Sequence, residues 1–358
     1  MGGAYLWRWQ HADTPSARIA TEAASFADIE GWEEDDQRAA LACYLRSAGM
    51  ADAGLPKPES GSIASLLADR EKARRFFEEA FLPFRVLADT GLLTSYFEPV
   101  LKGSRAPSLG FPIPVYRRPA DLRPLPSGHA LLTEGLTAAR DMGGCFEPYF
   151  TRADIEAGAL AGRGLEILYL ADAIEAFIMH VQGSGCVELD DGSKARLTFD
   201  GKNGHPYTSV ARCLIDGGLL SAKDADLDGM VSCLRARHDA GSFLQKNRSY
   251  IFFKEMDPAE PGPKGSIGVQ LHAGRSLAVD PLCHRLGIPI WVSAPALSFE
   301  DRPFRRLTVA QDTGSAIKGA QRGDIFAGQG GAARSVAGRV LHHCEFIVLQ
   351  PKCQSAGL

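Results

Sequence analysis

The sequence predicts a mainly β fold with flanking helices, and three observations support this prediction. The first 90 residues show helical periodicity, whereas short strand-like runs dominate from Gly91 onward. These runs recur at regular spacing between turn residues, which favours an antiparallel or mixed barrel over a doubly wound sheet. The chain also contains 38 glycines and 21 prolines among 358 residues, a composition that supplies many turns.

The predicted helices lie mainly in two N-terminal segments. Residues 13–50 are rich in alanine and mixed charges, and Leu41 and Leu45 lie on one face of a helix. Residues 63–87 repeat the pattern with aliphatic and aromatic side chains, which we interpret as a face that packs on the core. Helical periodicity returns in residues 206–240, where a glycine pair separates two pieces.

Strand-like runs occupy most of the remaining chain. Residues 187–189 and 195–199 flank Asp-Asp-Gly-Ser, which predicts a hairpin. Residues 177–185 suggest a strand that ends in a flexible polar turn, and Thr151 begins a short helix with a capping box. The other predicted strands are residues 92–100, 112–116, 165–170, 250–254, 267–271, 276–279, 290–292, 307–310 and 346–349.

The composition excludes several classes of protein. The formal net charge is −4 and no basic cluster stands out, so we expect no nucleic-acid partner. No apolar run approaches the roughly 20 residues that span a bilayer. The eight cysteines are scattered without a Cys-x-x-Cys pair, so we expect no zinc site. No cluster of metal ligands with suitable spacing appears either, so we expect no metal or organic cofactor. Their even number permits disulfides in an oxidising compartment without demonstrating any.

The segment from Asp312 to Phe326 is the best candidate for chemistry. Asp312 and Asp324 enclose Gly314 and Gly319, which permit tight turns and close approach of other groups. Asp324 precedes an Ile-Phe pair, so we expect a strand to present its carboxylate. A fixed acid with a second acid nearby is the arrangement that acid/base catalysis uses. An Asx-type turn with a surface acid is the alternative interpretation.

Asp280, Asp312 and Asp324 each lie at a strand end, and glycine-rich segments join them within 45 residues. The motifs around them are Asp-Pro, Asp-Thr-Gly-Ser-Ala-Ile-Lys-Gly and Arg-Gly-Asp-Ile-Phe, and they resemble the three-aspartate (3D) domain. With five further motifs, the chain resembles the membrane-bound lytic transglycosylase A (MltA) family from about residue 90 to residue 350. These further motifs are Thr94–Pro99, Pro114–Arg117, Val181–Gly185, Gly201–Tyr207 and Asn247–Phe253.

The resemblance implies a double-psi β-barrel domain with a second, smaller β-barrel domain inserted into it. We expect the first domain to combine residues 1–102 and 241–358, including the N-terminal helices. The inserted domain would comprise residues 103–240. The resemblance further implies that a groove between the two domains holds a peptidoglycan glycan strand.

The resemblance also implies a lytic transglycosylase, a lyase that cleaves the β-1,4 bond between N-acetylmuramic acid and N-acetylglucosamine without water and leaves a 1,6-anhydromuramoyl end. In this family the single acid/base is the last of the three aspartates, whose motif matches Asp324. Elementary chemistry is consistent with a single acid/base, because attack by the sugar's own C6 hydroxyl needs no second carboxylate to activate water. Asp324 must begin protonated, and we expect burial and the Asp312 carboxylate to raise its pKa.

Eight further residues are candidates for substrate contacts. Tyr96 and Tyr116 are of the type that stacks on sugar rings, although tyrosines in β-rich folds more often fill cores. Gln182 and its neighbours in a glycine-flanked turn suit hydrogen bonds to sugar hydroxyls and amides. Lys318 is either a surface lysine in a turn or a cation that positions Asp312 or substrate acetyl groups. The candidate substrate-binding set is Thr94, Tyr96, Tyr116, Gln182, Ser184, Asn203, Asp280 and Lys318.

Three features weaken the resemblance or its consequences. Ser315 stands where the family usually has a second glycine, and Asn203 belongs to an Asn-Gly pair, which is also an ordinary turn. Residues 1–10 show neither a secretory signal nor a lipobox, so we expect either a cytoplasmic protein or a mature form whose export segment has been trimmed or misassigned. From the resemblance we nevertheless expect a periplasmic or envelope-associated protein.

A non-catalytic peptidoglycan-binding module and a hydrolytic muramidase are the alternative functions. Asp324 argues against the module, because binding alone does not need a buried acid. The muramidase needs a base across the sugar ring, and the sequence offers no clear candidate. A serine hydrolase is excluded because no Gly-x-Ser-x-Gly elbow occurs in a suitable context. We expect a monomer that binds glycan strands, with cell-wall synthesis or divisome proteins as candidate partners.

Overall fold

The computed structural model describes most of the chain. Its described residues are 19–50, 54–88, 90–257, 260–299 and 301–352. The prediction about a secretory signal concerns residues 1–10 and lies outside this part, as do residues 13–18 and Cys353. None of the helices in the described ranges has both the length and the apolar character needed to cross a bilayer.

The chain forms two compact units. The first unit combines Met1–Ser95, Lys264–Ala327 and Val340–Leu358, and the second unit combines Tyr96–Pro263 and Gly328–Arg339. The chain therefore passes between the units at four points. Two of these points, immediately after Ser95 and after Ala327, lie within three positions of Thr94 or Asp324 in the sequence.

The bounds of the units differ from the predicted domains, which meet at residues 102/103 and 240/241. Helix α9 (Ala240–Gln245) and strand β12 (Ile251–Glu255) belong to the second unit, because β12 pairs antiparallel with β11 (Lys194–Lys202). A strand partner about 50 residues back in the chain cannot be found from local sequence pattern. The description of the two domains as β-barrels stays a prediction.

The first unit is built on a mixed nine-stranded sheet. In sheet order its strands are β1 (Thr21–Ala23), β2 (Phe81–Val86), β18 (Glu345–Pro351), β14 (Pro289–Phe299), β15 (Arg302–Thr313), β13 (Ser276–Val279), β16 (Arg322–Gln329), β3 (Leu92–Glu98) and β17 (Leu341–His343). Strands β13 and β15 run parallel, whereas β14 and β15 form a long antiparallel hairpin. Three segments that are distant in the sequence thus contribute to one sheet.

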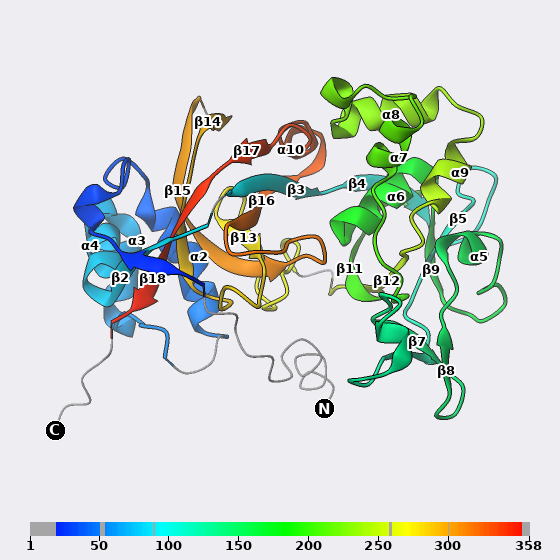
Figure 1. The fold of residues 1–358 in the computed structure, drawn as a ribbon, viewed down its shortest axis with the longest axis horizontal. Coiled ribbons are helices and arrows are strands. Elements are labelled where there is room, and N and C mark those ends of the chain that lie inside the picture. Colours follow the sequence, from blue (N-terminus) through cyan, green and yellow to red (C-terminus); the bar gives the residue numbers. More distant parts are fainter. Residues whose placement is uncertain (1–18, 51–53, 89, 258–259, 300, 353–358) are drawn as a thin grey trace. The chain divides into compact units, whose positions relative to one another are not determined.

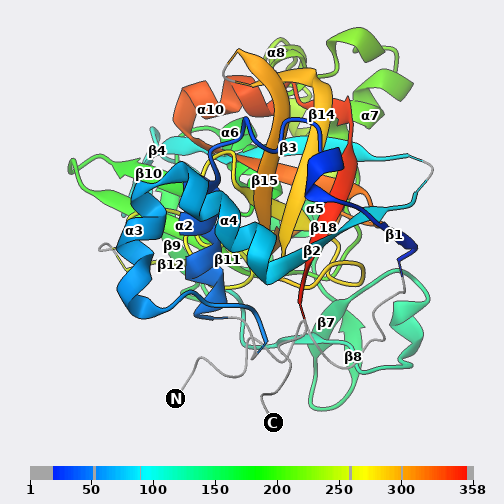
Figure 2. The same ribbon diagram turned by 90° about the vertical axis from the view of Figure 1, so that its left-hand side faces the viewer.

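Helices cover one face of this sheet, as Figures 1 and 2 show for α2 (Gln37–Ala48), α3 (Ile63–Ala68) and α4 (Arg70–Ala80). The 3₁₀ helices η1 (Phe26–Asp28) and η2 (Ser60–Ser62) precede them. The Tyr44 ring of α2 packs edge-on against Phe77 of α4 at 5.8 Å and against Phe81 at 5.7 Å. All three side chains are fully buried, so the predicted apolar helix faces do pack on the core.

The helical segments are shorter than predicted. Residues 81–86 form strand β2 instead of the end of a helix, and β2 pairs antiparallel with both β1 and β18. Pro83 explains the change, because proline lacks an amide hydrogen and disrupts a helix interior. Residues 21–23 are strand β1, although the prediction placed them in a helix.

The second unit contains a six-stranded and a three-stranded sheet. In sheet order the larger sheet holds β12, β11, β10 (Ser184–Leu189), β4 (Val100–Ser104), β9 (Glu166–Leu170) and β5 (Ile113–Tyr116), and the smaller one holds β6 (Leu122–Pro124), β7 (Ala138–Asp141) and β8 (Phe146–Pro148). The predicted hairpin is present, because β10 and β11 pair antiparallel around the turn at Asp190–Ser193. Strand β10 also pairs parallel with β4.

Most of the helices in the second unit are short. They are η3 (Ala130–Leu132), α5 (Arg152–Glu156), α6 (Ala173–Gln182), α7 (Val210–Asp216), η4 (Ala222–Asp224), α8 (Leu227–Arg235), α9 and α10 (Gly330–Ala337). Helix α5 begins with the predicted capping box, in which Thr151 and Asp154 bond reciprocally. Helix α10 was not predicted.

Helix α6 corrects the prediction of a strand over residues 177–185. The Asp172 side chain caps its start, accepting the backbone N–H groups of Ile174 at 2.8 Å and Glu175 at 3.2 Å. Gly183, with φ of 78°, ends it in the left-handed conformation that favours glycine. Four consecutive residues, Phe177 to His180, are buried and Val181 is exposed, so burial is not confined to one face and the run lacks a clear helical period.

Residues 267–271 also differ from prediction, since only an isolated bridge between Lys264 and Gln270 forms there. Gly268, with φ of 86°, turns the chain out of an extended course. The predicted fold class, mainly β with flanking helices, is confirmed.

Candidate active site

Asp324 lies on strand β16, where it stands opposite Ala278 of β13. The residue as a whole is partly buried. The preceding residue, Gly323, is packed so closely that an added Cβ would lie 2.7 Å from the ring of Phe346 and 3.0 Å from Leu277. A glycine at 323 therefore lets β16 lie close to the core and fixes the strand that carries the acid.

Thr94 of β3 contacts this acid directly. Its hydroxyl donates to Oδ1 of Asp324 at 2.5 Å, and the next residue, Ser95, donates to the backbone oxygen of Ile325 at 2.9 Å. Strands β3 and β16 are neighbours in the sheet, which brings residues 230 positions apart into contact. Because Oδ1 accepts the threonine proton, Oδ2 is the oxygen left to carry a transferable proton.

The surroundings of Asp324 favour its protonated form. Burial raises the pKa of Asp324 to about 6, and the negative charge of Asp312 adds to the rise. The Thr94 hydrogen bond and the positive charge of Arg322 act in the opposite direction. Burial prevails, so Asp324 retains a protonated fraction near neutral pH that an ordinary aspartate, with a pKa of about 3.9, does not have.

Asp312 lies near the end of strand β15 and is held by hydrogen bonds. Its Oδ1 accepts the Ser266 backbone N–H at 2.9 Å, the Ser266 hydroxyl at 2.7 Å and the Thr313 backbone N–H at 2.9 Å. The sequence analysis missed Ser266, because nothing in its local pattern links it to an acid 46 positions away. Its role is to fix the second carboxylate.

Asp280 follows strand β13 and is buried. It accepts the backbone N–H of Gly319 at 2.9 Å and that of Leu282 at 3.1 Å. The exposed Lys318 places its Nζ 3.7 Å from Oδ1 of Asp280. Lys318 is thus paired with Asp280 in the glycine-rich turn. Ser315 is exposed in the same turn.

Arg322 is a site residue that the sequence analysis quoted only as part of a motif. Its charge lowers the pKa of Asp324, two positions along β16. Its guanidinium contacts the backbone oxygens of Gly323 and Leu92. Burial lowers the pKa of Arg322 as well. Arg322 and Asp324 are two positions apart, and residues at this spacing share one face of a strand. This spacing could have identified Arg322 as a neighbour of the acid.

Comparisons with known proteins identify the family of this chain. The MltA specific insert domain matches residues 92–254 and the 3D domain matches residues 275–350. A crystal structure of a membrane-bound lytic murein transglycosylase from Agrobacterium tumefaciens is 33% identical, with a TM-score of 0.82, and the match covers 93% of this chain and 98% of that one. The chain belongs to the MltA family.

Two further relatives extend this comparison. The membrane-bound lytic murein transglycosylase A of Vibrio cholerae is 32% identical over 70% of this chain and 63% of its own length. The chain thus spans less than two thirds of that relative. A crystal structure of Escherichia coli MltA with bound chitohexaose is 25% identical, with a TM-score of 0.65, over 95% of this chain and 93% of that one.

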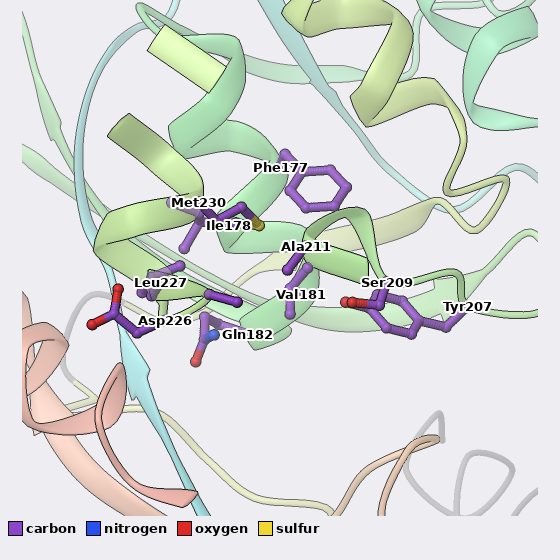
Figure 3. Close-up of a pocket in the computed structure, with 11 residues that line it drawn as sticks. Phe177, Ile178, Val181, Gln182, Tyr207, Ser209, Ala211, Asp226, Leu227 and Met230 are labelled. Carbon is purple, nitrogen blue, oxygen red and sulfur yellow. The ribbon is translucent and has the colours of Figure 1, made fainter. Parts of the chain in front are cut away.

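The MltA motif around Gln182 lies in the second unit. The Gln182 side-chain oxygen accepts the backbone N–H of Phe97 at 2.9 Å, so this oxygen fixes strand β3. Ser184 is partly buried at the start of β10. Gln182 also lines a pocket of about 150 Å³ between α6 and α8, with Tyr207 at its edge (Figure 3). The other lining residues are Phe177, Ile178, Val181, Ser209, Ala211, Ala225, Asp226, Leu227 and Met230.

The structure assigns core roles to two MltA motif residues that were candidates for substrate contacts. Tyr116 is 4% exposed and packs against Tyr250, with ring centres 6.5 Å apart, which leaves no ring face for a sugar. Asn203 is fully buried. Its amide donates to the backbone oxygens of Phe150 and Arg248 at 2.8 and 2.9 Å and its oxygen accepts the Tyr250 N–H at 2.9 Å. The amide and the oxygen of Asn203 are therefore all engaged within the protein.

Tyr96 lies on β3, two positions after Thr94, and is partly buried. Two positions further, Glu98 is fully buried, with one carboxylate oxygen 3.1 Å from Nε of Arg196. Burial raises the pKa of Glu98 to about 7, against the lowering effect of Arg196. Glu98 is the second acid with a strongly raised pKa on or beside β3, but its complete burial denies it contact with a glycan.

Proposed function

We propose that the chain is a lytic transglycosylase that cleaves the β-1,4 bond between N-acetylmuramic acid and N-acetylglucosamine in peptidoglycan. The observation that carries the proposal is the Asp324 carboxyl group. It lies where the MltA family has its acid, is held by Thr94 at 2.5 Å and has a pKa raised to about 6. The names and structures of the relatives support the reaction class.

In the first half of the proposed reaction, Asp324 donates its proton to the glycosidic oxygen. The bond from C1 of N-acetylmuramic acid to that oxygen breaks, and N-acetylglucosamine leaves with a free 4-hydroxyl. The carboxylate that remains on Asp324 is stabilised by the Thr94 hydroxyl and the Arg322 charge, which both favour the ionised form. Positive charge that develops at C1 and the new carboxylate attract each other.

In the second half, the C6 hydroxyl oxygen of the same N-acetylmuramic acid bonds to C1. Its proton passes to Asp324, which restores the starting acid. Atoms balance without water, and the product carries a 1,6-anhydro ring. One carboxyl group serves as acid and then as base, because the two steps follow each other at one face of the sugar.

Asp312 and Asp280 have supporting roles in this proposal. The charge of Asp312 helps to keep Asp324 protonated, and Asp280 holds the turn at Gly319. Among the other candidates, Tyr96 and Ser184 remain proposed substrate contacts on the strength of the MltA motifs alone.

We further propose that the protein acts at the cell envelope, where its substrate lies. The word "membrane-bound" in the names of the relatives supports this location. Contacts with cell-wall synthesis or divisome proteins, and a monomeric state, are proposals that follow from the same resemblance.

The decisive experiment digests purified peptidoglycan with wild-type protein, with Asp324→Asn and with Asp216→Asn as a matched control. Asp216 ends α7 and pairs with Arg212 on an exposed surface. Mass spectrometry separates 1,6-anhydro muropeptides from hydrolysed ones, which are about 18 Da heavier. We expect anhydro products from wild type and control, and a loss of about 10²–10⁴-fold for Asp324→Asn.

Other products would contradict the proposal in distinct ways. Reducing ends from the wild type indicate a muramidase. Sacculi that stay intact but bind wild type and Asp324→Asn equally indicate a binding module. Anhydro products at an undiminished rate from Asp324→Asn place the acid on another residue.

A further inference from the structure

We infer that Arg334 of helix α10 is a positioning residue for Asp324, acting through the two strands that α10 joins. The inference rests on the proposed function, because it concerns the acid of that reaction. Arg334 itself does not touch the acid. The argument follows the chain away from Asp324 in both directions.

Helix α10 joins the strands on either side of β3. Strand β16 carries Asp324 and ends at Gln329, and α10 begins at the next residue. After α10 the chain enters β17, where Leu341 stands opposite Thr94. In the sheet, β3 lies between β16 and β17. Both ends of α10 therefore lead into strands that flank the hydrogen bond between Thr94 and Asp324.

Arg334 ties α10 to two other helices of the second unit. Its Nη1 lies 2.9 and 2.8 Å from the two carboxylate oxygens of Glu175 on α6, and its Nε lies 3.3 Å from Oδ1 of Asp228 on α8. The Arg334 and Glu175 side chains are each only 21% exposed. A guanidinium that serves two acids in a partly buried place holds its geometry better than an isolated surface pair.

Glu175, which accepts the hydrogen bonds of Arg334, is itself held in place. Glu175 lies in the first turn of α6, which Asp172 caps. Nη2 of Arg235 lies 3.1 Å from carboxylate oxygens of both Asp172 and Glu175. At the other end of α10, a Cβ on Gly338 would lie 3.2 Å from Cβ of Leu227, so α10 packs closely on the start of α8.

The opposite end of α6 holds the strand that carries Thr94. The Gln182 oxygen accepts the backbone N–H of Phe97, three residues beyond Thr94. Glu175 and Gln182 are seven positions apart, which places them on one face of the helix. Helix α6 thus contacts both the segment that follows Thr94 and the segment that follows Asp324. A rigid helix in this place keeps the two segments in register.

Loss of the Arg334 contacts is expected to loosen Asp324 without removing any group that touches the substrate. A displacement of about 1 Å at a reacting group lowers the rate by up to about 10²-fold while ground-state binding persists. We therefore expect Arg334→Gln to lower kcat about tenfold and to leave KM within about twofold. Arg334→Lys keeps the positive charge but loses the planar guanidinium with its several N–H donors. Its kcat should therefore lie between those of the wild type and Arg334→Gln.

The matched control is Arg212→Gln in the same unit. Nε of Arg212 lies 2.9 Å from Asp216, but these side chains are 73% and 60% exposed, so kcat and KM should stay unchanged. Glu175→Gln should lower kcat as Arg334→Gln does. The double variant should be little worse than either single one, because both changes break one contact. Rates are normalised to the folded fraction measured by circular dichroism.

A second measurement does not depend on activity. Carbon-detected NMR follows the titration of the Asp324 carboxyl group in wild type and in Arg334→Gln. A loosened strand admits water to the carboxyl group, so its pKa should fall by about half a unit or more. A fall in the pKa of Asp324 supports the inference about Arg334. If the wild type releases no anhydro product, that result refutes the proposed function but leaves the inference about Arg334 standing. An unchanged pKa together with a normal kcat in Arg334→Gln would overturn it.

Discussion

Burial of Asp324 has two opposite effects, because it favours the protonated acid and disfavours the carboxylate that forms during the reaction. As a general acid it must hold a proton near neutral pH, and burial provides this by raising its pKa to about 6. Once ionised, however, the carboxylate loses hydration that the Thr94 hydroxyl and the Arg322 charge replace in part. The site therefore trades stability for reactivity at one residue.

This trade predicts that Asp324→Asn stabilises the protein at alkaline pH. The folded-state pKa of Asp324 lies above its unfolded value of about 3.9, so its favourable contribution is complete below pH 4 and is lost as pH rises through about 6. An amide carries no charge to desolvate. Thermal and urea unfolding should show the Asp324→Asn protein about 1–3 kcal/mol more stable than wild type at pH 8 and equal to it near pH 4. A variant less stable than wild type at pH 8 would contradict this account.

Thr94 predicts a shift in the pH dependence of activity. Its hydrogen bond lowers the pKa of Asp324, so Thr94→Val should let that pKa rise above about 6. The alkaline limb of the kcat profile should move to higher pH by about one unit, while kcat at its optimum falls because the new carboxylate loses a donor. Thr94→Ser retains the hydroxyl and should keep the wild-type limb. A limb that moves to lower pH in Thr94→Val would refute the assigned effect.

At this scale the sequence predicted some site residues better than others. Asp324 and Thr94 lie in recognisable motifs, and the structure brings them into contact. Asn203 and Tyr116 lie in equally recognisable motifs yet serve the core. Motif and composition do not separate these cases, because exposure depends on packing between distant segments. The contact between Ser266 and Asp312 could not be predicted from local sequence pattern, because the two residues are 46 positions apart.

Among the elements, strand β3 shows how closely catalytic and structural residues are placed. Thr94 contacts the acid, and four positions later Glu98 is fully buried beside Arg196 of β11. Both Glu98 carboxylate oxygens lack a well-aligned hydrogen bond, so Arg196 is the main compensation for the buried charge. This ion pair fixes the last residue of β3, which belongs to the second unit, to β11 of the same unit.

Arg196→Met should therefore destabilise the protein in a pH-dependent way. Glu98 already has a folded-state pKa of about 7, and removal of Arg196 raises it further. The group's favourable contribution is present below its unfolded pKa of about 4.3 and is lost as pH rises through about 7. We expect a loss of about 3–5 kcal/mol at pH 8 and a much smaller one at pH 5, measured by urea unfolding.

The double variant Arg196→Met/Glu98→Gln supplies the control for this prediction. It removes the charge that Arg196 compensates, so stability at pH 8 should largely return. An equal loss in single and double variants would mean that Arg196 acts through its other contact, with the backbone of Glu260 at 2.8 Å.

The elements themselves were predictable to different degrees. The hairpin at Asp190–Ser193 and the capping box at Thr151 depend on residues next to each other, and both were found. Helix α6 was mistaken for a strand, although its caps at Asp172 and Gly183 were visible in the sequence. Its apolar run is buried on several sides, and periodicity fails where burial is not confined to one face.

At the scale of the whole molecule, the first unit is assembled from three separate segments of chain. Asp35, in the loop before α2, and Arg275, just before β13, form a bidentate pair at 2.7 and 2.8 Å, 240 positions apart. Arg275 also donates to the backbone oxygen of Leu307, and Asp35 accepts the Leu307 N–H. One buried pair thereby joins the N-terminal segment to two strands, a connection that no local pattern reveals.

This pair predicts a large and salt-insensitive contribution to stability. The Arg275 and Asp35 side chains are 5% and 4% exposed, so Arg275→Met leaves a buried carboxylate without its cation. We expect the free energy of unfolding to fall by about 3–5 kcal/mol, in low salt and in about 1 M salt alike, because buried charges are little screened. The matched control is Arg38→Met, which breaks the Arg38–Asp36 pair at 2.8 Å with side chains 43% and 45% exposed. That loss should be much smaller and should diminish in salt, because exposed pairs contribute little and are screened. Equal losses for the two variants would show that the buried pair does not hold the N-terminal segment to the strands around Arg275 and Leu307.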